Sequence, residues 1–467
     1  MFEQLISDVN NALYGYILII LLVLCGLYFT VRSKFSQFRL FPQQLKCVLE
    51  KPKDKEGISS FQALMVSTAS RVGTGNIIGV STALCLGGFG SVFWMWMIAL
   101  IGVASALVES TLAQIFKKRG VNGTFYGGPA YYIEAGLKSR SLAVLFSIFL
   151  IVTYGFGFNM LASYNLQSTF SGYAFYNPET TPWIIGVILA VLVGYCLLGG
   201  GKRIVKVTGV LVPVMGILYV FVALFVVVKN IGLLPSVFAR IFEEALDFQA
   251  IFGGFSGSCV MYGIKRGLFS NEAGVGSAPN ASATADVNHP VTQGLVQILS
   301  VFIDTILICS ATAFMCLCSG VEPTEALSGA PYVQESLRTV LGGAGPIFIT
   351  VAMILFAFTT LLGNLFYVDQ CVFHILKREP GKNFKRVYHL IAALVILIGA
   401  VLSADLLWNI ADITMGLMAL INIPTIFILG KYAMRALKDY DRQRKSGKEI
   451  LFHAKDIGLE NQVDCWK

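Results

Sequence analysis

The sequence predicts an all-α integral membrane protein with eleven transmembrane helices, and three observations lead to this fold class. First, 55% of the 467 residues are hydrophobic and only 13% are charged, whereas soluble proteins carry about 25% charged residues. Second, the apolar runs have the roughly 20-residue length of a helical span and lack the ten-residue alternation of a membrane β-barrel. Third, lysine and arginine gather in alternate loops, as expected of cytoplasmic segments.

The apolar runs divide into one N-terminal span followed by two groups of five. The run at 250–264 is short, so its helix is expected to begin earlier, near Phe238. The predicted spans are residues 13–31, 60–86, 91–116, 141–170, 182–198, 207–228, 250–264, 292–317, 346–374, 387–404 and 409–430.

The distribution of positive charge predicts the orientation of the chain. All but four of the 35 lysines and arginines fall in segments assigned to one side of the membrane, and the exceptions are Arg71, Lys229, Arg240 and Arg338. Because cytoplasmic loops are rich in these residues, we expect the N-terminus outside and the C-terminus in the cytosol. Topology therefore explains the net charge of +8, and no nucleic-acid partner is expected.

Four segments follow from this order of spans. The basic, polar C-terminal segment is expected to form a solvated helix along the membrane surface. The segments are an N-terminal helix with a basic loop (1–57), a first five-helix repeat (58–230), a second five-helix repeat (231–432) and the cytoplasmic tail (433–467).

Two other functional classes fit the sequence poorly. The ten cysteines form no CxxC pair, the four histidines have no metal-ligand spacing, and no HExxH or paired-carboxylate signature is present. We therefore expect neither an enzyme nor a bound cofactor. A channel needs a continuous polar lining, whereas the polar residues here are clustered within otherwise apolar spans.

The first polar cluster is Ser70-Arg-Val-Gly-Thr-Gly-Asn76, inside the span 60–86. An interior glycine costs a helix about 1 kcal/mol relative to alanine, and lipid tolerates broken backbone only where protein or a cavity satisfies the freed groups. The ends of two half-helices can hold a carboxylate through N–H groups and a cation through carbonyls. The alternative is a glycine-mediated packing face between helices.

The second cluster is Gly253-Gly-Phe-Ser-Gly-Ser258, another glycine-rich interruption. Paired interrupted segments in the two halves of a chain point to a transporter binding site near the middle of the membrane. The two clusters lie five spans apart, and this odd number gives the two halves opposite orientations. We therefore predict an inverted five-plus-five repeat with broken helices at about 60–86 and 240–264.

The third cluster is Thr359-Thr360, with Asn364 one helical turn later on the same face. Two adjacent hydroxyls can complete a shell of oxygen ligands around sodium. The alternative is hydrogen bonding of each hydroxyl to the carbonyl four residues earlier, which is common in membrane helices.

Further polar residues lie in Lys265–Pro279, which we interpret as a cytoplasmic loop that is either a gate or an ordered connector. Four charged residues fall within spans, where they need partners: Arg71, Glu109, Asp304 and Asp369. Arg71 would either anchor a substrate or pair with an acid such as Glu109, and one of the acids would be the candidate for carrying protons.

These motifs together resemble the bacterial and archaeal alanine/glycine:cation symporter family. The resemblance covers about residues 10 to 435, and the loop Arg266–Gly274 with its extension to Pro279 is its most diagnostic part. The other matching motifs are Arg71–Ile77, Glu109–Gln114, Tyr126–Pro129 and Thr359-Thr360.

The resemblance implies a LeuT-type fold in a bacterial or archaeal plasma membrane, sodium-driven symport of a small neutral amino acid, and a protein that we expect to be monomeric. It also implies the site residues. The amino acid would contact Gly73, Thr74, Gly75, Asn76, Phe255, Ser256, Gly257, Ser258, Thr360 and Asn364, and sodium would bind carbonyls of Ala69 and Val72 with Thr359 and Thr360.

Two departures from the family pattern bear on the substrate. Many relatives carry a tryptophan where this chain has Asn364, and Ala162 stands where relatives often have glutamine in the fourth span. Asparagine in place of tryptophan would make the pocket roomier and more polar. A longer neutral amino acid such as glutamine is therefore an alternative substrate to alanine or glycine, and proton coupling is an alternative to sodium.

The substitution Thr360→Ala tests the implied sodium site. Because it removes one oxygen ligand, we expect the sodium concentration that half-activates amino-acid uptake to rise by about tenfold, the equivalent of roughly 1.4 kcal/mol. The measurement is the initial uptake rate into proteoliposomes against sodium concentration. Unchanged sodium activation would argue against the assignment.

Overall fold

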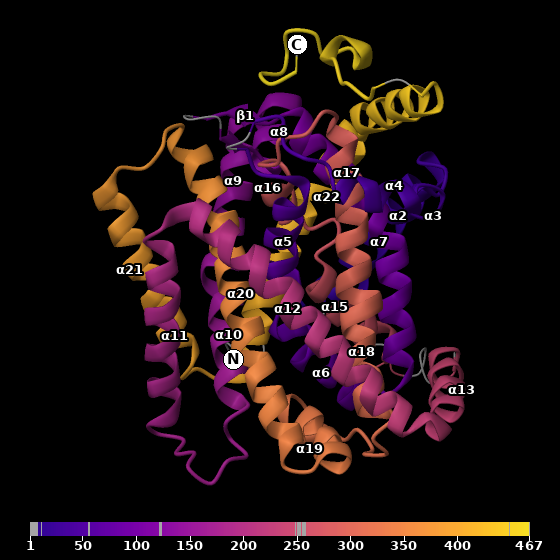
Figure 1. Cartoon of the computed structure of the whole chain (residues 1–467), viewed down its shortest axis with the longest axis vertical. Helices are drawn as coiled ribbons and strands as arrows, with labels where there is room; N and C mark the ends of the chain where they lie inside the picture. Colours follow the sequence, from indigo (N-terminus) through magenta and orange to yellow (C-terminus); the bar gives the residue numbers. More distant parts are fainter. Residues whose placement is uncertain are drawn as a thin grey trace.

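The computed structural model describes residues 8–10, 12–54, 57–120, 124–247, 249, 254, 258–447 and 449–466. Helices build nearly all of it, with one short two-stranded sheet in which Lys118 pairs with Tyr126 and Arg119 with Phe125. Long helices run along the longest axis, and shorter helices lie at the two ends (Figure 1). The prediction of an all-α membrane protein is confirmed at this level.

Seven described helices are long and apolar enough to cross a membrane, and each matches a predicted span. Two shorter apolar helices, Thr74–Gly87 and Thr181–Leu197, fall within two further predicted spans. The seven are Asp8–Arg32, Gly90–Ile115, Arg140–Ser168, Gly200–Lys229, Pro290–Leu317, Ala344–Leu376 and Ala404–Lys445.

The first half of the chain contains an N-terminal long helix, a broken helix, a second long helix, a short peripheral helix and three further long segments. Two of the long helices contain π-helical turns (η1 and η4). The elements are η1 (Leu13–Ile17), α2 (Leu18–Arg32), α3 (Ser36–Arg39), α4 (Phe41–Val48), α5 (Ser60–Arg71), η2 (Thr74–Asn76), α6 (Ile78–Gly87), α7 (Gly90–Ile115), β1 (Lys118–Arg119), β2 (Phe125–Tyr126), α8 (Pro129–Gly136), α9 (Arg140–Leu150), η4 (Ile151–Gly157), α10 (Phe158–Ser168), α11 (Thr181–Leu197) and α12 (Gly200–Lys229).

The second half follows a similar order, with a second broken helix near its start. The elements are η5 (Ile231–Leu233), α13 (Leu234–Ala245), α15 (Cys259–Asn271), α16 (Pro279–Ser282), α17 (Pro290–Val301), η7 (Phe302–Cys309), α18 (Ser310–Leu317), η8 (Glu325–Leu327), α19 (Ala330–Leu341), α20 (Ala344–Leu376), α21 (Lys382–Gly399), α22 (Ala404–Lys445) and η9 (Ala454–Ile457).

The two broken helices lie side by side and antiparallel in the core. α5 packs against α16, and α6 packs against α15. Asp286, just after α16, donates its N–H to the carbonyl of Ile58, just before α5, over 2.9 Å. The start of the first broken helix and the end of the second are therefore at the same level.

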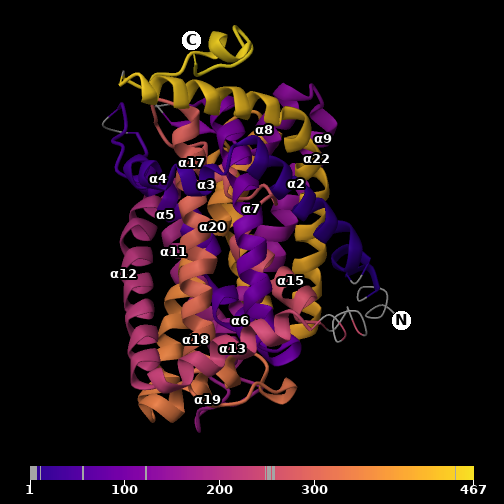
Figure 2. The same ribbon diagram turned by 90° about the vertical axis from the view of Figure 1, so that its right-hand side faces the viewer.

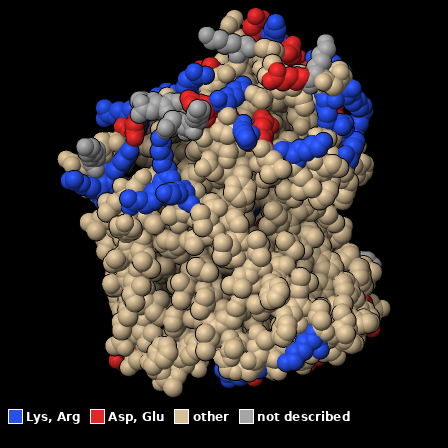
Figure 3. Space-filling view, in the orientation of Figure 1, with Lys and Arg blue, Asp and Glu red and all other residues tan. Residues whose placement is uncertain are grey.

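Charged residues divide the surface into zones. Lysine and arginine gather at the end that carries the C-terminus and α8, while a broad uncharged band covers the middle (Figure 3). The band has the exposed apolar side chains expected of a lipid-facing surface, such as Ile188, Phe221 and Val191. The two edges of this uncharged band therefore indicate where the two membrane interfaces lie.

The C-terminal segment differs from the predicted solvated helix. α22 continues unbroken to Lys445, and its last turns lie across the charged end of the molecule (Figure 2). The chain then folds back, so that the indole N–H of Trp466 donates to the carbonyl of Gln114 over 2.8 Å. Lys117 lies 4.0 Å from the ring centroid of Phe125 and 5.0 Å from that of Trp466, and burial lowers its pKa to about 7. Aromatic contacts therefore hold the tail on the protein.

Contact between α5 and α20 depends on Gly363. A Cβ atom there would lie 2.7 Å from the backbone nitrogen of Ser70 and 3.0 Å from its Cα, so the two helices would have to separate. Gly363→Ala is therefore expected to destabilise the fold by about 1–3 kcal/mol, as overpacking does elsewhere. Thermal unfolding of the detergent-solubilised protein measures this loss.

Gly155→Ala is the matched control, because a Cβ there would make only ordinary contacts at 3.6 and 3.8 Å. Equal melting temperatures of the two variants would contradict the role given to Gly363.

Candidate functional site

The first break lies where the sequence predicts it. α5 ends at Arg71, and Val72 (ψ 83°) and Gly73 (φ −136°, ψ −156°) leave the helical conformation. The chain then makes the 3₁₀ turn η2 before α6 begins. The N–H of Gly73 donates to Oδ1 of Asn76 over 2.8 Å, and this bond closes the turn. The predicted interruption of the span 60–86 is confirmed.

The second break lies about twenty residues after its predicted position. Phe255, Ser256 and Gly257 fall outside the described residues, and Ser258 caps the first turn of α15 by accepting from the N–H of Met261. α15 is continuous from Cys259 to Asn271, so the predicted break does not lie within this helix, and the non-helical residues 246 and 247 belong to the connection between α13 and α15. The backbone leaves the helix at 272–278, between α15 and α16.

Backbone geometry explains the true position of this break. Glu272 has a φ of 52°, and Gly274 and Gly276 have φ values of 84° and 91°, a region that glycine enters without strain. The pattern Gly274-x-Gly276 repeats Gly73-x-Gly75 of the first break. That repetition is the signal in the sequence that would have located it.

The interpretation of Lys265–Pro279 as a cytoplasmic loop is also wrong. Lys265 and Arg266 lie in the buried middle of α15, where Asp412 of α22 accepts from both over 2.9 and 3.5 Å. The guanidinium of Arg266 also lies 3.9 Å from the ring centroid of Trp408. A hydropathy argument places such charges in water because it does not detect a partner 146 residues away.

The two breaks face each other. The hydroxyl of Ser70 donates to Oε1 of Glu272 over 3.4 Å, and Nδ2 of Asn76 donates to Oγ of Ser270 over 3.0 Å. A Cβ atom at Gly75 would lie 2.7 Å from the ring of Phe269, so the first break packs directly on the end of α15. Freed backbone groups from two half-helix pairs therefore meet in the core.

Thr360 presents a free hydroxyl to the first break. Its Oγ1 is buried and has no hydrogen-bond partner among the described residues. A Cβ atom at Gly73 would lie 2.1 Å from that oxygen, so only glycine leaves space between them. A buried hydroxyl without a partner is costly unless a ligand supplies one.

The hydroxyl of Thr359, unlike that of Thr360, forms hydrogen bonds within its own helix. Its hydroxyl donates to the carbonyls of Leu355 and Phe356 over 2.9 and 3.2 Å and approaches Sδ of Met215 on α12 at 3.5 Å. This is the back-bonding that the sequence left open as an alternative. Ala69 and Val72, the other residues of the implied sodium site, are buried around the end of α5.

α10 contributes a residue that sequence reasoning did not select. Asn165 donates from Nδ2 to Oγ1 of Thr74 over 3.1 Å, while its Oδ1 has no partner among the described residues. It also lines a hollow of about 700 Å³ between α6, α10, α15, α19 and α22. Asn165 therefore joins the first break to a cavity of ligand size.

Asn364 and Asn76 are engaged by the protein itself. Oδ1 of Asn364 accepts from the hydroxyl of Ser70 over 2.6 Å, and its Nδ2 donates to Asn159 over 3.0 Å. Asn76 donates to Oδ1 of Asp304 over 2.7 Å. Both amides link helices around the breaks, and Asn364 does so without any exposed surface.

Arg71 does not form the ion pair suggested with Glu109. Its Nη1 donates to Oε1 of Gln297 over 2.8 Å. Glu109 instead accepts from Nδ2 of Asn422 over 2.9 Å and from the N–H of Gly274 over 3.4 Å. The Arg71 guanidinium and the Glu109 carboxylate therefore form hydrogen bonds with different residues.

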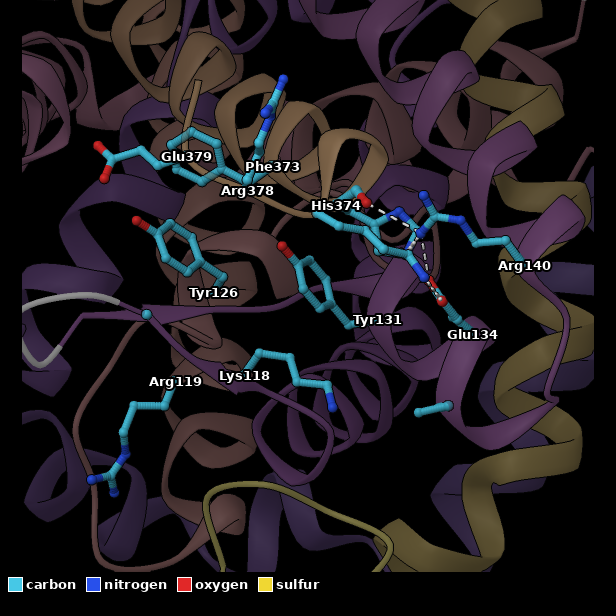
Figure 4. Close-up of a pocket in the computed structure, with 13 residues that line it drawn as sticks. Lys118, Arg119, Tyr126, Tyr131, Glu134, Arg140, Phe373, His374, Arg378 and Glu379 are labelled. Carbon is cyan, nitrogen blue, oxygen red and sulfur yellow. Dashed lines mark hydrogen bonds and ion pairs between the residues drawn. The ribbon is translucent and has the colours of Figure 1, made fainter. Parts of the chain in front are cut away.

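A separate hollow of about 740 Å³ lies at the charged end and shares no lining residue with either break (Figure 4). Glu134 bonds Arg140 over 2.7 Å and Lys377 over 3.1 Å there. Partial burial would raise the pKa of Glu134, but these two cations lower it to about 2. This region is structural support around α8, α9 and α20, and the facing breaks remain the candidate site.

Gly73→Ala tests the space between the first break and Thr360. The added Cβ would overlap Oγ1 of Thr360, so we expect amino-acid uptake to fall by at least about tenfold. Gly79→Ala on α6 is the matched control, because its Cβ would meet only Trp408 and Arg266 at 3.7 and 3.8 Å. Uptake that falls equally in both variants, or in neither, would contradict this arrangement.

Known proteins share both the sequence and the fold. A family model described as the sodium:alanine symporter family matches residues 1–454. The amino-acid carrier protein AlsT of Bacillus subtilis is 43% identical over 467 residues, covering 100% of this chain and 98% of AlsT. The probable sodium/glutamine symporter GlnT of the same organism is 42% identical over 466 residues, covering 99% and 96%.

Among solved structures, the crystal structure of MhsT in complex with L-phenylalanine is similar in fold. The two share a TM-score of 0.54 at 15% sequence identity, over 88% of this chain and 94% of that one. The chain therefore belongs to the sodium:alanine symporter family.

Proposed function

We propose that the protein is a secondary active transporter that carries a small neutral amino acid, alanine or glycine, together with sodium by alternating access. The observation that carries this proposal is the pair of facing breaks with the unpartnered Thr360 hydroxyl beside Gly73. Such breaks offer N–H groups to a carboxylate and carbonyls to a cation. Membership of a symporter family supports transport rather than catalysis.

The proposed architecture has eleven spans, with one helix before an inverted five-plus-five repeat at 58–230 and 231–432. The order of elements supports it, because each half has a broken helix, a long helix and then a short peripheral helix. The peripheral helices α8 and α19 lie at opposite ends of the molecule, as inversion requires (Figure 1).

We place the charged end with the C-terminus in the cytosol and the N-terminus outside, in a bacterial or archaeal plasma membrane. The concentration of lysine and arginine at that end supports this orientation. The hollow of about 700 Å³, near α19 at the other end, then opens towards the outside. The ring of Phe269 contacts Phe158 and Trp408, which lines this hollow, with ring centroids 4.6 and 4.9 Å apart. The protein is proposed to act as a monomer.

The binding residues follow from this placement. We propose that the amino acid contacts Gly73, Thr74 and Gly75, with Asn165 added and Asn76 holding the break in shape. Sodium would bind Thr360 and carbonyls of Ala69 and Val72, with Thr359 stabilising the helix that carries Thr360. The implied contacts of Phe255, Ser256 and Gly257 lie outside the described residues, and Ser258 caps the start of α15, whose 13 residues separate it from the second break.

Glutamine is a second candidate substrate. Asn159 supports it, because it accepts from Asn364 near the first break and its own buried Nδ2 has no hydrogen-bond partner among the described residues. A site with such groups suits a substrate that carries its own amide. The relative GlnT is named as a probable sodium/glutamine symporter.

Uptake of labelled alanine and glutamine into proteoliposomes tests the proposed function. The measurement uses an inward sodium gradient, an inward proton gradient or neither. We expect accumulation of a neutral amino acid only with the sodium gradient, because coupling makes each ligand favour binding of the other. Accumulation driven by the proton gradient alone would contradict sodium coupling, and the better substrate of the two identifies the transported class.

A further inference from the structure

The core around the two breaks carries an imbalance of buried charge. Arg71, Glu109, Glu272 and Asp304 are each at most 2% exposed. Among the described residues, none of the three carboxylates forms an ion pair within 4 Å, although all three interact electrostatically with Arg71. Isolated charges at this depth are costly, so each carboxylate needs either a proton or a bound cation beyond the one guanidinium.

Arg71 forms no direct ion pair with any of the three carboxylates. Its Nη1 donates to Gln297, and its Nε and Nη2 have no partner among the described residues. One guanidinium therefore faces three carboxylates and contacts none of them. A further cation is the simplest means of restoring the balance.

The partners of each acid indicate which one is open to a cation. Glu109 accepts from N–H groups of Asn422 and Gly274, which cannot turn a lone pair towards a cation. Asp304 accepts from the amide of Asn76 as well as from hydroxyls. Glu272, among the described residues, accepts hydrogen bonds from hydroxyls alone, those of Ser70 at 3.4 Å and Ser277 at 2.6 Å.

Further oxygen atoms surround Glu272. Oδ1 of Asn364 lies 2.6 Å from Oγ of Ser70. The phenol oxygen of Tyr154 is fully buried, has no hydrogen-bond partner among the described residues and interacts electrostatically with Glu272. Carboxylate, hydroxyl and amide oxygens are ligands for a hard cation, and the set contains no sulfur or imidazole that would select a softer metal.

We propose that a sodium ion binds at Glu272, with Ser70, Ser277, Asn364 and Tyr154 as the surrounding oxygen donors. This site is separate from the sodium site at Thr360 and rests on the proposed symport. Its ligands come from α5, the second break, α20 and η4, so the ion connects both broken helices to the neighbouring scaffold. Hydroxyls that now donate to the carboxylate turn their lone pairs to the ion. Each transport cycle then carries two sodium ions per amino acid.

Coupling stoichiometry tests this proposal directly. In proteoliposomes at zero membrane potential, the alanine gradient that stops net flux is measured against a fixed tenfold sodium gradient. Two ions per amino acid balance about a hundredfold alanine gradient, whereas one ion balances about tenfold. We expect the wild type to balance about a hundredfold and Glu272→Gln, which keeps the shape of the side chain, about tenfold.

Glu109→Gln is the matched control, because Glu109 is equally buried but held by N–H donors. It is expected to keep the hundredfold balance, since a merely structural role changes rates and leaves this ratio unchanged. Identical balances for the wild type and Glu272→Gln would overturn the second sodium site. If the alanine gradient balanced by the wild type changes with a proton gradient at fixed sodium, Glu272 binds a proton. That result would also overturn the second sodium site.

A second variant keeps the test decisive if Glu272→Gln does not fold. Ser277→Ala removes one hydroxyl ligand, so the sodium concentration that half-activates uptake should rise by about tenfold. Ser282→Ala is the control and should leave this concentration unchanged, because the hydroxyl of Ser282 bonds to the carbonyl of Pro279. Equal sodium activation in these two variants would overturn the proposal. Absence of any sodium-driven accumulation by the wild type would instead refute the proposed symport itself.

Discussion

The structure depends on one constraint, which is that backbone polar groups buried in a membrane must be hydrogen-bonded. Each break in a helix frees such groups, and asparagine side chains satisfy many of them. Asn76 accepts from the N–H of Gly73, Asn422 donates to the carbonyl of Gly274, and Asn280 donates to the carbonyls of Gly276 and Ser277. Two of the buried atoms that have no hydrogen-bond partner among the described residues, Oγ1 of Thr360 and Oδ1 of Asn165, lie around the first break. Both lie in the region where ligands are proposed to bind.

Close packing makes the breaks respond together. Gly73 faces Thr360, Gly75 faces Phe269, and Gly276 approaches Asn422, Phe146 and Pro129 at 2.9 to 3.0 Å from its Cβ position. None of these contacts leaves room for a side chain, so movement at one break must displace the neighbouring helix. The ring of Phe269 also contacts Trp408, which lines the hollow of about 700 Å³. Tight contact of this kind is the physical basis for linking ligand binding to the opening of one side.

Buried charge adds a second link between the halves of the chain. Glu272 at the second break bonds Ser70 before the first, and Asn364 on α20 bonds the same serine. Lys265 and Arg266 form a further buried group with Asp412 on α22. These ionic groups are satisfied only when helices from distant parts of the sequence are in place, so they favour one arrangement of the core over alternatives.

Composition, span length and the glycine pattern at Ser70–Asn76 were sufficient to predict a membrane protein with a broken helix, because these features act locally and depend on lipid as the solvent. The family resemblance assigned Thr360 and Gly73 to one binding site, and the tertiary structure brings the two residues side by side. The position of the second break, the burial of Lys265 and Arg266, and the docking of Trp466 were decided only by the tertiary structure. Each depends on contacts between residues far apart in sequence, and hydropathy averages over neighbours cannot detect such partners.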